Sequence, residues 1–89
     1  MPDATGKQTL VQGKITSLEV MDYTGGTGCK ANIFSDQLTN IQVTTSSLLL
    51  TTALQTFYVL GQTQGTEVSA NYVKGDGNNN LLFIATKPS

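Results

Sequence analysis

The chain has 89 residues, of which 38% are hydrophobic and 12% charged, and its formal net charge at pH 7 is -1. This length predicts a single domain, near the lower size at which one hydrophobic core is stable without help. No apolar run approaches the roughly 20 residues that a membrane-spanning helix needs, so we expect no membrane span.

Residue usage argues against several function classes. The five basic residues are all lysines, and the chain contains no histidine and no arginine. Histidine is the usual general base at neutral pH and the commonest metal ligand, and arginine makes the commonest specific contacts to nucleic acid. The single cysteine, Cys29, cannot form an internal disulfide, and we expect it to be a small core residue. We therefore expect no enzyme activity, no metal site and no cofactor.

Residues 1–8 are polar and broken by Pro2 and Gly6, which predicts a flexible N-terminal arm before a single domain at residues 9–87. Residues 1–8 do not have the charged and apolar pattern of a leader segment. We therefore expect a cytoplasmic protein or the processed form of a secreted one.

The first predicted strand covers residues 9–23. Its apolar positions change parity near Ser17, which indicates a bulge in a strand that bends between two faces. Residues 24–28 are rich in glycine but lack the lysine and hydroxyl of a phosphate-binding loop, so they predict a hairpin turn.

Two shorter strands follow, at residues 29–34 and 38–45, with a turn at residues 35–37. Alternation predicts that Cys29, Ala31 and Ile33 face inward in the first of them. In the second, Ile41 and Val43 are expected to face inward.

The segment 46–61 is the one predicted helix of respectable length. Its apolar stripe follows the 3.6-residue period and consists of Leu50, Ala53, Leu54, Phe57 and Leu60. Ser46 or Ser47 can cap its start, and Gly61 is the expected end.

Two strands close the chain, at residues 66–74 and 81–86, joined by the loop 75–80. Asp76, Asn78 and Asn80 have the alternate spacing of calcium ligands, but the glycine and the distal glutamate of such a loop are absent. We therefore expect a hairpin loop here.

This order predicts an all-β fold with one helix: a five-stranded OB-type Greek-key barrel, β-β-β-α-β-β, with the helix plugging one end. Leu48, Leu49 and Tyr58 lie off the helix stripe. Their exposure in a small monomer would be unfavourable, so the second face of the helix is expected either to be more buried than usual or to meet a partner.

Short strings of sequence strengthen this view. The run Ser47-Leu48-Leu49-Leu50, the start Pro2-Asp3…Thr5-Gly6-Lys7 and the loop 75–80 together resemble the B subunits of AB5 toxins, particularly the Shiga type. The resemblance implies an OB-fold homopentamer that binds cell-surface glycans, with its helices lining a central pore. The interface residues it suggests are Leu48, Leu49, Thr52 and Tyr58.

The chain also departs from that family. A lone Cys29 excludes the family's intrachain disulfide, and Gln42 and Val43 stand where Shiga-type subunits place arginine and tryptophan. Polar and aromatic residues that still suit a sugar are the candidate ligand-binding residues: Asp22, Tyr23, Thr24, Asn40, Gln42, Tyr72, Asn78 and Asn79.

Three functions remain open. The leading one is a non-enzymatic, ring-forming module that binds a glycan or a partner protein. The second is single-stranded nucleic-acid binding, through a face formed by Phe34, Tyr72, Lys14, Lys30 and Lys74. The third is a structural subunit of a phage or secretion assembly that has no small ligand.

Overall fold

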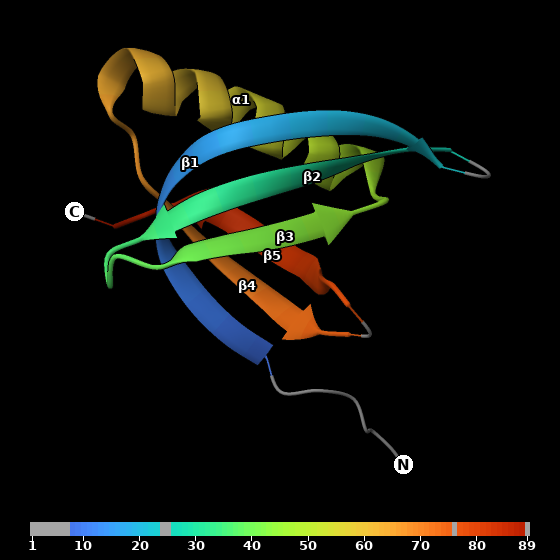
Figure 1. The fold of residues 1–89 in the computed structure, drawn as a ribbon. Helices are drawn as coiled ribbons and strands as arrows, with labels where there is room; N and C mark the ends of the chain where they lie inside the picture. Colours follow the sequence, from blue (N-terminus) through green and yellow to red (C-terminus); the bar gives the residue numbers. More distant parts are fainter. Residues whose placement is uncertain (1–7, 24–25, 76, 89) are drawn as a thin grey trace.

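The computed structural model describes residues 8–23, 26–75 and 77–88 (Figure 1). Within these residues the chain forms five strands and one helix. Their bounds are β1 Gln8–Tyr23, β2 Gly26–Ser35, β3 Asn40–Thr45, α1 Leu48–Gln64, β4 Val68–Lys74 and β5 Asn79–Thr86. The predicted order β-β-β-α-β-β is confirmed. None of the described helices has the length and apolarity needed to cross a membrane.

The strands close into a barrel in the order β1-β2-β3-β5-β4, as an OB-type barrel requires. β1 pairs with two neighbouring strands: its first half pairs with β4 and its second half with β2. The register of β1 against β2 shifts between Ile15 and Ser17, which confirms the bulge expected near Ser17. This bulge lets one strand bend between two sides of the barrel.

Gly13 is the residue at which β1 pairs with both neighbours, lying opposite Ser35 of β2 and Val68 of β4. A Cβ atom at this position would overlap the backbone carbonyl of Phe34. Glycine is therefore required here by the close approach of two backbones.

The helix begins as predicted and ends later than predicted. Ser47 is the N-cap, and its side chain accepts a hydrogen bond from the Leu50 backbone N–H. The helix continues through the expected end at Gly61 and stops at Gly65, which has the left-handed φ of 72°. Gly61 is buried, and a Cβ atom there would lie 3.2 Å from Cγ of Lys14. Either glycine could end a helix by its sequence alone. The packing of α1 against β1 at Gly61 keeps that residue helical, so the helix ends at Gly65.

Strand ends also differ from the prediction. β3 starts at Asn40, because Leu38 takes a positive φ of 62° and donates its N–H to the Ser35 carbonyl in the preceding turn. β2 starts at Gly26, inside the expected turn, because Gly26 pairs with Tyr23. β4 starts at Val68 and β5 at Asn79, whereas the predicted starts were residues 66 and 81.

The core lies inside the barrel and beneath α1, which lies along β1 in Figure 1 and packs against β1, β2 and β5. Cys29, Ala31, Ile33 and Val43 are fully buried, as their strand positions predict. From the helix, Leu54 is fully buried. Partly buried helix residues that pack on this core are Leu50, Ala53, Phe57 and Tyr58.

Candidate binding face

The outer surface of β1, β2 and β3 gathers polar side chains around one exposed ring. Because Cys29, Ala31 and Ile33 point into the core, the intervening residues of β2 point outward. The register then places their strand neighbours beside them. We call this surface the amide face, and it consists of Lys14, Ser17, Glu19, Lys30, Asn32, Phe34, Asn40, Gln42 and Thr44.

Hydrogen bonds connect three of these side chains across three strands. Nδ2 of Asn32 donates to Oγ of Ser17 at 2.7 Å, and Nδ2 of Asn40 donates to Oδ1 of Asn32 at 3.3 Å. Each bond fixes the orientation of an amide on an otherwise solvated surface. Gln42 lies opposite Asn32, and its side chain is exposed.

A shallow hollow of about 250 Å³ lies on this face, lined by Ser17, Leu18, Glu19, Lys30, Asn32 and Gln42. Nζ of Lys30 lies 4.0 Å from Oε1 of Glu19, and both side chains are well exposed. A pair of this kind adds little to stability, and its opposite charges leave the hollow without net charge. The hollow therefore offers hydrogen-bonding groups to a ligand but no strong electrostatic attraction.

Phe34 adds an apolar surface to the amide face. It is 43% exposed and lies between Lys14 of β1 and Asn40 of β3. An exposed ring beside oriented amides can cover the apolar face of a ligand while the amides bind its polar edge.

The structure brings together only some of the predicted ligand-binding residues. Asn40 and Gln42 lie on the amide face. Asn79 is adjacent, but its side-chain amide donates to the backbone carbonyl of Gln42 at 2.8 Å and so joins β5 to β3. Asn78 is exposed in the β4–β5 hairpin, where its carbonyl accepts from the Gly75 N–H.

The other predicted residues lie elsewhere. Tyr72 is only 5% exposed and belongs to the core, where its parity with Val68 and Ala70 places it. Asp22 and Tyr23 end β1, opposite Thr27 and Gly26 of β2. Thr24 lies outside the described residues. The eight candidates therefore do not form one site.

Sequence reasoning missed Ser17, Glu19 and Asn32 as ligand candidates, and it considered Phe34 and Lys30 only for nucleic acid. The available signal was the bulge at Ser17 together with the alternation of β2, which place these side chains on the face opposite the core.

The predicted interface residues divide into two groups. Leu48 and Leu49 are 71% and 79% exposed, and Thr52 is exposed beside them, with its hydroxyl donating to the Leu48 carbonyl at 2.9 Å. Tyr58 instead is half-buried and packs on the core. Val59, which the sequence did not single out, is 56% exposed on the helix.

The described residues contain no cluster of three or more histidine, cysteine, aspartate or glutamate side chains. Burial raises the pKa of the Cys29 thiol, and a hydrogen bond from the Glu19 backbone only partly opposes this. A thiol of this kind stays protonated and unreactive at neutral pH.

Comparison with known proteins adds no relative: no family model matches the chain, and no curated protein sequence matches it significantly.

Proposed function

We propose that this protein is a non-enzymatic OB-type binding module whose amide face binds an uncharged, hydroxyl-rich ligand such as a glycan. The observation that supports this most directly is the hydrogen-bonded row of Ser17, Asn32 and Asn40 beside the exposed ring of Phe34.

The chemistry of the face favours this ligand class. Each amide offers both donors and an acceptor, which matches sugar hydroxyls that donate and accept in turn. The ring of Phe34 suits the apolar C–H face of a pyranose. The charges of Glu19 and Lys30 are opposite, so the pair has no net charge that would favour a charged ligand over a neutral one.

We further propose that the protein forms a homo-oligomer, with a pentamer as the favoured state, through the exposed face of α1. Leu48, Leu49 and Val59 expose apolar surface there, and no charged residue occurs between Asp36 and Glu67 in the sequence. Burying such a surface stabilises an assembly by about 25 cal/mol per Å² of apolar area. An uncharged helix face also presents no like-charge repulsion between copies.

A glycan array followed by titration calorimetry tests ligand binding. We expect Asn32→Ala to weaken binding of any glycan hit by about tenfold, because it breaks the hydrogen-bonded row. Asn71→Ala is the matched control, since Asn71 is an amide on β4 and outside the amide face. Equal affinity of the Asn32 variant and the wild type would rule out this face as the ligand site.

Light scattering tests the assembly. We expect a mass near five subunits for the wild type and a smaller mass for Leu48→Gln/Leu49→Gln. A monomeric wild type at micromolar concentration would refute the oligomer and leave the glycan proposal to be judged alone. A ring that binds no glycan would instead favour a structural subunit.

Single-stranded nucleic acid is the second candidate, because Lys30 lies on the same face as Phe34 and Lys14 is the register partner of Phe34, although the stem of Lys14 lies against Gly61 of α1. Base stacking on an exposed ring between cations is a common mode of OB domains. Fluorescence anisotropy with a labelled oligonucleotide at low salt tests it. Binding that is lost in Lys14→Gln/Lys30→Gln and in Phe34→Ala would favour nucleic acid, and no binding at low salt would end this alternative.

A further inference from the structure

A second pocket lies at one end of the barrel and is separate from the amide face. It has a volume of about 330 Å³, and among the described residues it shares no lining residue with the hollow of that face. We call it the barrel mouth, and its main lining residues are Thr9, Val11, Asp36, Thr39, Ile41 and Tyr72.

The pocket exists because the strands separate here. β1 and β2 stop pairing at Gly13 and Ser35, and the bond from the Asp36 N–H to the Gln12 carbonyl, at 2.8 Å, marks the point where they diverge. On the other side, β3 pairs with β5 only at Thr44, within the described residues. The end of the barrel is therefore left open between β1 and β3.

The floor of the barrel mouth is apolar with one polar group. Val11 is 6% exposed, and Ile41 packs on the core beside it. Tyr72 lies opposite Thr9 in the register and is 5% exposed while lining the pocket. A tyrosine in the pocket lining presents a phenol hydroxyl that can donate or accept a hydrogen bond with a ligand.

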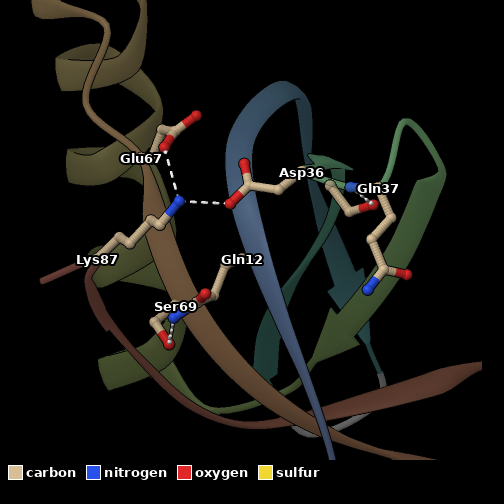
Figure 2. A network of polar contacts seen from close by, with 7 residues as sticks. Gln12, Asp36, Gln37, Glu67, Ser69 and Lys87 are labelled. Atoms are coloured by element: carbon tan, nitrogen blue, oxygen red, sulfur yellow. Dashed lines mark hydrogen bonds and ion pairs between the residues drawn. The ribbon is translucent and has the colours of Figure 1, made fainter.

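The rim is held in place by its own hydrogen bonds. Oγ of Ser35 accepts from the backbone N–H groups of Gln37 and Thr39, each at 3.2 Å. Lys87 binds Asp36 and also lies 3.3 Å from Oε1 of Glu67, as Figure 2 shows. A rim fixed in this way preserves the pocket in the unliganded protein, which reduces the cost of binding.

The charge of the rim selects the ligand. Among the described residues, Asp36 is the only charged one that lines the pocket, and its partner Lys87 is shared with Glu67, so these three described groups together carry a negative charge. We propose that the barrel mouth binds a small amphipathic molecule that is neutral or cationic, with an aromatic or short aliphatic end seated on Val11, Ile41 and Tyr72. The volume is within the range of small-ligand pockets.

Titration of the full chain with benzyl alcohol, benzylamine and benzoate, followed by amide NMR, tests this site. We expect saturable shifts for the neutral and cationic probes at Thr9, Val11, Thr39 and Ile41, with roughly millimolar Kd because such fragments are small. Benzoate, of the same shape but negative, should bind at least about tenfold more weakly.

One pair of variants and a third substitution make the result specific. Thr9→Trp places an indole at the inward position of the mouth and should abolish the shifts, whereas Gln8→Trp, on the neighbouring outward position, should preserve them. Tyr72→Phe keeps the ring and should weaken benzyl alcohol about fivefold by removing the hydroxyl. Amide spectra confirm that each variant is folded.

Several outcomes would overturn the proposal. They are the absence of saturable shifts, equal binding of benzoate, or binding that Thr9→Trp leaves unchanged in a folded protein. Shifts confined to Lys30, Asn32 and Gln42 would also overturn it, and they would assign the probes to the amide face. Failure of the glycan experiments does not affect this test, because the two sites share no residue.

Discussion

The side-chain amide of Asn79 donates to the backbone carbonyl of Gln42 at 2.8 Å, which joins β5 to β3. Within the described residues, Thr44 opposite Asn80 is the one paired position between these strands, and Oγ1 of Thr44 lies 3.4 Å from the Asn79 carbonyl. Closure of the barrel therefore depends on one short seam, in which a side chain replaces a backbone partner.

Loss of the Asn79 amide should weaken this seam. We expect Asn79→Ala to lower the free energy of unfolding by about 1–2 kcal/mol, because it leaves the Gln42 carbonyl without that donor. Urea unfolding measures the effect, and hydrogen exchange should show the faster opening in β3 and β5. Asn78→Ala is the control, since only the backbone carbonyl of Asn78 is used in the hairpin. Equal effects of both substitutions would show that the seam does not hold the barrel closed.

The backbone approach at Gly13 makes a second prediction. Gly13→Ala should lower the free energy of unfolding by about 2–3 kcal/mol, because the new Cβ would overlap the Phe34 carbonyl and force β1 away from β2. Gly61→Ala should change it by less than about 1 kcal/mol, because the helix preference of alanine offsets a tight contact with Lys14. Urea unfolding of both variants measures the difference, and a harmless Gly13→Ala would contradict the register described for β1 and β2.

Thr51 offers a way to stabilise the fold. It is 2% exposed, and its hydroxyl has no hydrogen-bond partner among the described residues. Thr51→Val keeps the shape and removes the buried polar group, so we expect a gain of about 1 kcal/mol by chemical denaturation. Thr52→Val, one residue along on the exposed side of α1, should have little effect. A loss of stability in Thr51→Val would mean that the hydroxyl does have a partner in solution.

The buried thiol of Cys29 should respond to pH with a definite sign. Burial raises its pKa above the ordinary value of 9.0. Above that value the unfolded chain releases the proton while the folded chain retains it, so the free energy of unfolding falls as pH rises toward the folded pKa. Above about pH 9, the free energy of unfolding of the wild type should therefore fall relative to that of Cys29→Ala. A difference that is independent of pH would contradict this burial.

Reaction of Cys29 with a thiol reagent gives a separate measurement. The thiol is fully buried, so labelling requires local or global opening. We expect the native protein to react at least about a hundredfold more slowly than the denatured chain. Rapid labelling of the native protein would show that the end of the barrel near β1 and β2 opens readily.

The Lys87 ion pairs predict a dependence on both pH and salt. Hydrogen bonds to Asp36 and then to Glu67 raise the Lys87 pKa above its ordinary value of 10.5. The stabilisation is therefore fully present below that pH and is lost as pH rises through the folded pKa. Lys87→Met should lower the Tm at neutral pH, and high salt should reduce the difference, because these side chains are exposed enough to be screened. Lys74→Met, at the exposed end of β4, should have a smaller effect, and equal effects would refute the role of Lys87.

Local patterns predicted most of the fold. Alternation located all five strands, and the 3.6-residue stripe located α1, because these signals depend on which residues must be buried; the cap was predicted at Ser46 or Ser47, and it is Ser47. The end of the helix was misplaced, because Gly61 and Gly65 carry the same local signal. The site could be predicted only in part for a similar reason. Asn40 and Gln42 are visible on one strand, but their neighbours Ser17 and Asn32 come from other strands.

Composition, periodicity and the order of the elements predicted a small, weakly charged barrel with one helix, because they limit what a chain can bury. Which polar residues meet depends on how distant strands pair in the folded protein. The bulge between Ile15 and Ser17 sets the register that aligns Ser17 with Asn32, and barrel closure places Tyr72 at the mouth and Asn79 at the seam. Pairing between distant strands is a long-range event, so no local pattern contains it.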